Sequence, residues 1–149
     1  MGTVKYDSHL LSAYDFKNPI LRDFYRAFNE TDGYDNQAII NLCSDTGEIT
    51  VIKMLAHFNQ NVSVTIVQLK EGITEEKNDV LERAAHKLIG TAQLLGFKEF
   101  SEDSRKLTSM IRNHYPQEVI TSTAYGYLEK CTALFNLLES SCPSLKIHL

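Results

Sequence analysis

With 149 residues, 43% of them hydrophobic and 23% charged, the chain has the length and composition of a single globular domain, which argues against an intrinsically disordered protein. A formal net charge of −4 argues against nucleic acid as a partner, because neutralising phosphates requires a basic surface. No stretch approaches the roughly 18 uninterrupted apolar residues of a membrane span, and the N-terminus lacks the apolar core of a signal peptide, so we expect a cytoplasmic protein without a membrane partner.

Residues 1–35 are predicted to form an N-terminal extension. Asp, Asn and Gly are frequent there, and the turn-like run TDGYDN around Gly33 separates this segment from the helical part of the chain. Within it, Pro19 can open a short helix, because Leu21, Phe24 and Phe28 recur at helical spacing and could lie against the rest of the protein.

From residue 36 onward, every periodic segment is helical. A short helix around Ile39 precedes a long one from about 49 to 71, which Gly72 should end. A third helix is predicted to begin with Thr74 as its N-cap and to end at Gly96.

Two further amphipathic helices complete the chain. One spans about 99–112, and the last begins at Pro116 and cannot continue past Pro143. We therefore predict an all-α fold: an up-and-down antiparallel four-helix bundle over residues 36–142, with additional short N-terminal helices and a C-terminal tail at 143–149.

The three cysteines do not suggest a metal site. Cys43, Cys131 and Cys142 show no ligand spacing such as CxxC, and an odd number leaves one unpaired in any disulfide scheme. We expect reduced thiols in the core and no bound metal.

His86 has an unusual position on the third predicted helix. At 100° per residue it lies about 150° from the apolar stripe, so its imidazole should face solvent. Gly90 follows one turn later, and a glycine inside a helix costs about 1 kcal/mol relative to alanine. We interpret this glycine as keeping the space beside the imidazole open for another protein. The other residues predicted to neighbour the ring are Glu82, Arg83, Lys87, Ile89 and Gln93.

The run AHKLIGTAQLLGFKEFSEDSRKL, from Ala85 to Leu107, resembles the signature of histidine phosphotransfer domains. That signature is His-x-Leu-Lys-Gly, two small residues, then Leu-Gly. The matching positions, in order, are His86, Leu88, Gly90, Thr91, Ala92, Leu95 and Gly96. Ile89 departs from it, since it stands where the family usually has a lysine that helps to hold the phosphoryl group. Arg83 and Lys87 are the cations that could partly replace this lysine.

The resemblance implies that His86 is a phosphoacceptor. A neutral imidazole offers a ring nitrogen, expected to be Nε2, as a nucleophile toward the aspartyl phosphate of a receiver domain. The implied partners are response-regulator receiver domains and a hybrid sensor histidine kinase. No cofactor is implied for this chain, because the receiver should supply Mg²⁺. The protein is then a phosphocarrier rather than a conventional enzyme, and Gln93 could hydrogen-bond the ring or the phosphoryl group.

Other interpretations remain open. The loss of the lysine at Ile89 could mark a degenerate binding module that regulates a kinase or receiver without transferring phosphate. The chain could also be a histidine-dependent catalyst, or the phosphoacceptor domain of a kinase. Gly90 could serve close helix packing, Ile89 could belong to the core rather than to a docking surface, and Glu82 with Arg83 could be a solvated charge pair.

Overall fold

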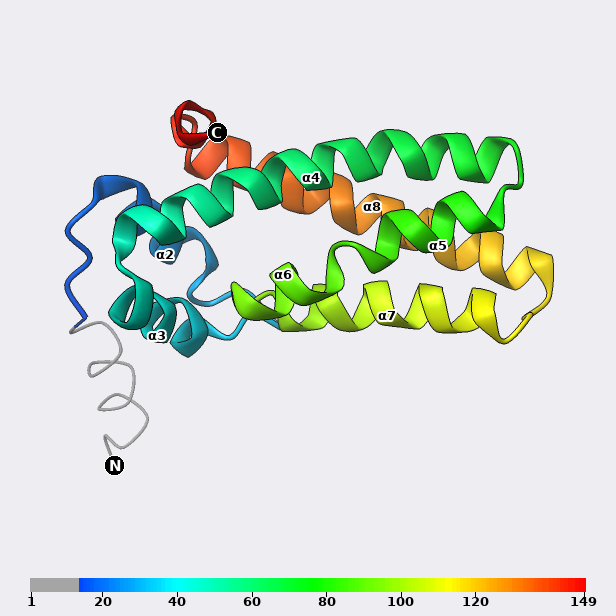
Figure 1. The fold of residues 1–149 in the computed structure, drawn as a ribbon, viewed down its shortest axis with the longest axis horizontal. Helices are drawn as coiled ribbons and strands as arrows, with labels where there is room; N and C mark the ends of the chain where they lie inside the picture. The colour runs from blue at the N-terminus through cyan, green and yellow to red at the C-terminus, as the bar shows by residue number, and fades with distance from the viewer. Residues whose placement is uncertain (1–13) are drawn as a thin grey trace.

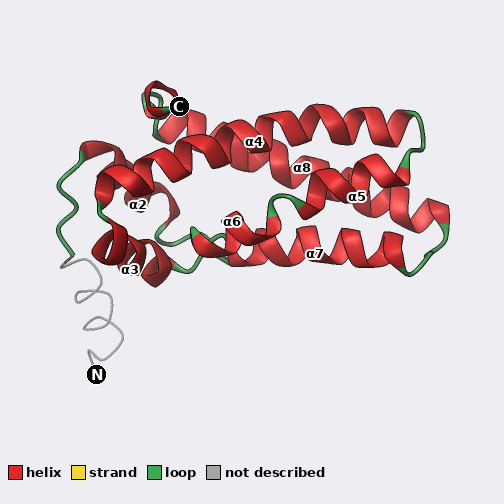
Figure 2. Cartoon of the chain, viewed as in Figure 1, coloured by secondary structure: helices red, strands yellow, loops and turns green. Residues whose placement is uncertain are grey.

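The computed structural model describes residues 14–149, and all regular structure in that range is helical (Figures 1 and 2). The elements are α2 (Pro19–Phe28), α3 (Asn36–Thr46), α4 (Glu48–Thr74), α5 (Asn78–His86), α6 (Ile89–Leu94), α7 (Lys98–Arg112), α8 (Gln117–Ser141) and the 3₁₀ helix η1 (Leu145–His148). The first part of the predicted N-terminal extension, residues 1–13, lies outside the described range. None of the helices among the described residues combines the length and the apolar character that crossing a bilayer requires.

The long helices lie side by side along the length of the molecule (Figure 1). α4 packs against α5 and α8, and α7 packs against α5, α6 and α8. The short helices α2 and α3 lie at one end, where η1 also packs against α4. The turns between α4 and α5 and between α7 and α8 lie at the other end (Figure 1).

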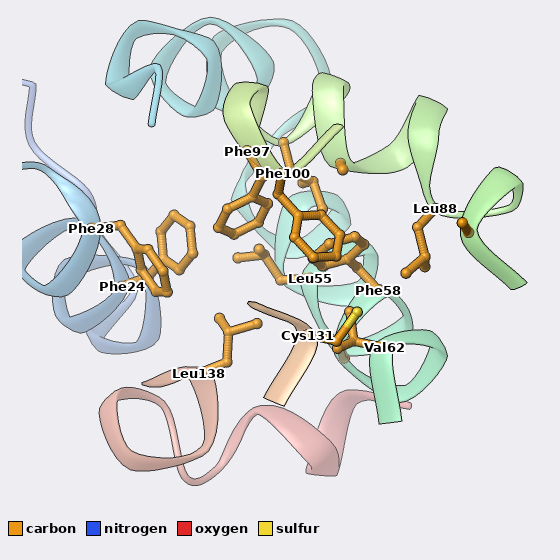
Figure 3. Packing of buried hydrophobic residues seen from close by; sticks show 14 of the residues in the cluster. Phe24, Phe28, Leu55, Phe58, Val62, Leu88, Phe97, Phe100, Cys131 and Leu138 are labelled. Carbon is orange, nitrogen blue, oxygen red and sulfur yellow. The ribbon is translucent and has the colours of Figure 1, made fainter. Parts of the chain in front are cut away.

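An aromatic cluster connects the N-terminal segment to the long helices (Figure 3). Phe97 stacks on Phe58 of α4, with ring centroids 5.2 Å apart, and meets Phe28 of α2 edge-to-face at 5.4 Å. Such pairs contribute about 0.5–1.5 kcal/mol each beyond the area they bury. Leu21, Phe24 and Phe28 are all buried, as their helical spacing predicts. α2 therefore contributes to the same core as the rest of the protein.

The predicted boundary between the second and third helices was wrong. α4 continues through Gly72 to Thr74, so Gly72 is no terminator and Thr74 is no N-cap, and α5 begins at Asn78. Gly72 is instead a close-packing residue, since an added Cβ would lie 2.7 Å from Cδ2 of Leu81. The glycine lets α4 and α5 approach each other at this end.

The single third helix predicted from Thr74 to Gly96 is divided into α5 and α6 (Figure 2). Between them, the amide of Leu88 donates to the carbonyl of Ala85 at 3.2 Å, a tighter i to i−3 bond in place of the α-helical one. Leu88 is buried in the core at this turn. Gly96 follows α6 with a φ of +98°, and an added Cβ there would lie 2.6 Å from the carbonyl oxygen of Asp35, so only glycine fits.

The C-terminal segment 143–149 is more than a tail after the last helix. α8 ends at Ser141, before Pro143, as predicted. The chain then forms η1, whose Leu145 is buried and which packs against α4. Through Leu145, this segment is part of the packed core.

The three cysteines lie in the core, as predicted for structural thiols. Burial raises the pKa of Cys131 to about 12 and the pKa values of Cys43 and Cys142 to about 11. These thiols stay protonated at neutral pH, which makes them poor nucleophiles and poor metal ligands.

Thr65 of α4 provides a test of the packing. Its side chain is fully buried, and its hydroxyl has no hydrogen-bond partner among the described residues. We expect Thr65→Val to raise the free energy of unfolding by about 1 kcal/mol, because it removes an unsatisfied polar group at similar volume. Urea unfolding measures this change. The same substitution at Thr50, which is exposed on the same helix, should change stability by less than about 0.5 kcal/mol. A destabilised Thr65→Val protein would contradict the prediction.

Candidate functional site

His86 is the last residue of α5 and is exposed, as its helical phase predicts. Leu81, Ala84 and Ala85 of the same helix are buried, so the apolar face of α5 points into the core and the imidazole points away from it. Among residues 14–149, no hydrogen bond or ion pair holds the imidazole, although the polar side chains around it have partners. Both ring nitrogens are thus available to a molecule that approaches from outside.

Gly90 leaves open space on α6, one turn beyond the histidine. A Cβ built on this residue meets no atom within 4 Å. Gly72 is different, because there the side chain of Leu81 lies too close for a Cβ. Close helix packing therefore explains Gly72 but does not explain Gly90.

On one side of His86, Lys87 is bound to α4. Its ammonium donates to Oε1 of Gln68 at 3.1 Å, and partial burial lowers the pKa of Lys87. Val64 lies one turn before Gln68 on α4 and has 42% of its surface exposed. We call Val64, Gln68 and Lys87 the α4 flank.

On the other side, α7 contacts both α5 and α6. The hydroxyl of Ser101 donates to the carbonyl oxygen of Ile89 at 3.0 Å, and the guanidinium of Arg105 donates to Oε1 of Gln93 at 3.4 Å. Arg112 forms an ion pair with Glu82. We call Ser101, Arg105 and Arg112 the α7 flank.

Glu82 and Arg83 do not pair with each other. Glu82 pairs with Arg112 of α7, whereas Arg83 lies 3.7 Å from Asp79 in an exposed i, i+4 pair. An exposed pair of this kind contributes only about 0.3–0.5 kcal/mol. The two residues are separate elements of the surface beside His86 rather than a dyad.

Ile89 is half-buried at the start of α6. Its main-chain carbonyl is bound to Ser101 of α7, and its side chain brings no charge to the site. The position that carries a lysine in the resembled family is therefore apolar in this fold, and any positive charge beside the imidazole must come from elsewhere.

Sequence reasoning missed Arg105. The residue lies on another helix, 19 positions after the histidine, and only the packing of α7 against α5 and α6 brings it to this surface. One signal was present in the sequence: Ser101, Arg105 and Arg112 are spaced by four and seven residues, so they share one face of α7.

The arrangement suits a nucleophile that works on a partner. Among the described residues, no carboxylate is paired with the imidazole, as the aspartate of a catalytic triad would be. Within residues 14–149, no three His, Cys, Asp or Glu side chains are grouped so that they could hold a metal. A mainly apolar hollow of about 330 Å³ between the start of α7 and α8 takes no residue from α5 or α6.

Comparison with family models, with curated proteins and with solved structures gives no match for this chain.

Proposed function

We propose that this chain is a histidine phosphotransfer protein of a multistep two-component phosphorelay. His86 accepts a phosphoryl group from an aspartate of one receiver domain and passes it to another. The observation that carries this proposal is an exposed imidazole without a partner in the described part of the chain, followed one turn later by a glycine with open space beside it.

The chemistry needs one nucleophile on this side of the interface. The lone pair of Nε2 forms a bond to phosphorus while the bond from phosphorus to the aspartate oxygen breaks, and that electron pair stays on the carboxylate. The ring keeps its Nδ1 proton and becomes a phosphoimidazolium, so charge balances. The reverse step returns the phosphoryl group to a second receiver aspartate. Mg²⁺ belongs to the receiver in this scheme, and the chain itself needs no cofactor.

The proposed function needs a scaffold that presents His86 and a cellular location where its partners occur. We propose that α4, α5 with α6, α7 and α8 make an up-and-down antiparallel four-helix bundle, which the packing of α4 and α7 against their neighbours supports. We place the protein in the cytoplasm, where receiver domains and the cytoplasmic part of a hybrid sensor histidine kinase would meet it.

The α4 flank supplies an apolar contact for the receiver. Val64 is exposed one turn before Gln68, which binds Lys87, so a partner that covers His86 can also cover this valine. We expect Val64→Ser to weaken receiver binding about fivefold, or about 1 kcal/mol, because it removes apolar area from the interface. Isothermal titration calorimetry with a receiver domain measures the change.

Val119 of α8 is the matched control for that experiment. It is 40% exposed, close to the 42% of Val64, and Val and Ser have similar helix propensities. Val119→Ser should leave the dissociation constant unchanged. Equal affinities for the two variants would exclude the α4 flank from the interface.

Phosphoryl transfer is tested with a labelled receiver. Incubation with a receiver domain carrying a ³²P-aspartyl phosphate should move the label to this chain, and the product should be acid-labile and alkali-stable, as a phosphoimidazole is. Tight receiver binding without transfer would favour the degenerate binding module instead, in which the uncharged Ile89 replaces a lysine needed for chemistry. Neither binding nor transfer with any receiver would reject both functions.

A further inference from the structure

We infer that Arg105 of α7 holds the phosphoryl group on His86 and supplies the positive charge that Ile89 does not. This inference rests on the proposed phosphotransfer function and names one residue of the same site. It assigns the charge to a neighbouring helix rather than to Arg83 or Lys87.

The register of α7 places Arg105 on the stretch of helix that runs past the histidine. Two contacts fix that register: Ser101 binds the carbonyl of Ile89, and Arg112 pairs with Glu82. His86 lies between Glu82 and Ile89 along the chain, and Arg105 lies between Ser101 and Arg112. Because the two contacts run in opposite order on the two segments, the segments are antiparallel, and His86 and Arg105 both lie between the two contacts.

The helical phase of His86 turns it toward α7 rather than α4. At 100° per residue, the histidine is about 40° from Glu82, which contacts α7, and about 100° from Lys87, which contacts α4. The ammonium of Lys87 is bound to Gln68 of α4. Of the flanking helices, α7 is therefore the nearer source of a cation.

The charge of Arg105 is available to an anion. Among the described residues it has no carboxylate partner, and its one hydrogen bond is to the neutral amide oxygen of Gln93. Arg83 and Arg112 differ, because Asp79 and Glu82 already neutralise them. The exposed side chain of Arg105 can thus bind an incoming phosphoryl group without first breaking an ion pair.

Gln93 positions this guanidinium. It lies two turns after His86, and its amide oxygen accepts from Arg105 at 3.4 Å, which holds the arginine at α6, the helix that carries Gly90. A guanidinium has several N–H donors in a fixed plane, so it can keep Gln93 and still donate to two phosphoryl oxygens. Arg105 would then stabilise the negative charge of the transferring group as the N–P bond forms.

The experiment compares Arg105→Gln with Lys106→Gln. The two substitutions remove the same charge from adjacent exposed residues of α7, but Lys106 faces a depression shared with Gly126 and Lys130 of α8. Each variant is labelled with a phosphorylated receiver and, separately, with phosphoramidate, a small donor that needs no protein interface. We expect Arg105→Gln to slow labelling at least tenfold with both donors, whereas Lys106→Gln should match the wild-type protein.

Two further variants distinguish an effect of the charge of Arg105 from an effect on the structure. Arg105→Lys should recover most of the rate, because it restores the charge, and Gln93→Ala should lower the rate less than Arg105→Gln does. Circular dichroism and urea unfolding check that each variant is folded. A merely structural role of Arg105 would alter unfolding without a selective loss of labelling.

The outcomes distinguish this inference from the proposed function. Wild-type labelling on His86 with an unchanged rate in Arg105→Gln would overturn the role of Arg105 and leave the phosphotransfer function standing. A slowdown with the receiver alone, and none with phosphoramidate, would also overturn it, because the arginine would then act in docking. The absence of label on wild-type His86 would reject both.

Discussion

A His86→Gln protein is expected to take up no phosphoryl group from a labelled receiver, while its fold and its affinity for that receiver stay close to those of the wild type. Glutamine has a similar reach but an amide nitrogen that is not nucleophilic, so no N–P bond can form. The side chain is exposed and has no partner in the described part of the chain, so its replacement should change the free energy of unfolding by less than about 0.5 kcal/mol.

Label transfer and mass spectrometry of the modified peptide show which residue takes up the phosphoryl group, and calorimetry measures the affinity for the receiver. His57→Gln is the matched control, because His57 is also exposed on a helix but lies on α4. It should be labelled at the wild-type rate. Label that persists in His86→Gln would mean that another residue is the phosphoacceptor.

The second large effect is expected at Gly90. A Gly90→Leu protein should be more stable than the wild type and yet transfer phosphoryl groups at least about 100-fold more slowly. Leucine is a better helix former than glycine by about 0.8–1 kcal/mol, and no atom lies within 4 Å of a Cβ at this position. The same side chain would occupy the space through which the receiver must approach His86, and a misplacement of about 1 Å in such a step can cost on the order of 100-fold in rate.

Gly126 of α8 is the control for this variant. It too lies inside a helix with no atom within 4 Å of an added Cβ, but α8 packs against α4 and α7 rather than carrying the histidine. Gly126→Leu should therefore gain similar stability and transfer at the wild-type rate. Thermal unfolding and single-turnover transfer measure the two quantities. A Gly90→Leu protein that transfers normally would show that partners do not approach across this face.

Local periodicity was enough to predict most of the helical structure. A helix buries residues at i, i+3, i+4 and i+7, so the apolar stripe, the exposed phase of His86 and the buried face of α2 follow from spacing along one segment. The effect of proline is also local. Pro19 opens α2, and α8 ends before Pro143, because the proline ring restricts the backbone of the residues next to it.

Glycine was harder to interpret than proline. Gly72 was predicted to end a helix but lies inside α4, where the side chain of Leu81 explains it. Gly96 does follow the end of a helix. The residue must be glycine because the carbonyl of Asp35, distant in the sequence, leaves no room for a Cβ. Whether a glycine serves a turn, a close approach or open space depends on atoms from other segments.

The amino-acid sequence by itself determined that the chain is helical, which face of each helix is buried, and that an imidazole with a glycine one turn later points away from the core. Only the tertiary structure decided that the helix after Thr74 divides at Leu88, that Lys87 is bound to α4, and that Arg105 lies on the α7 flank. The physical reason is the range of the interactions. Helical phase depends on neighbours three or four residues apart, whereas the contacts between helices depend on how the helices are rotated and aligned against each other, and packing of the whole core determines that arrangement.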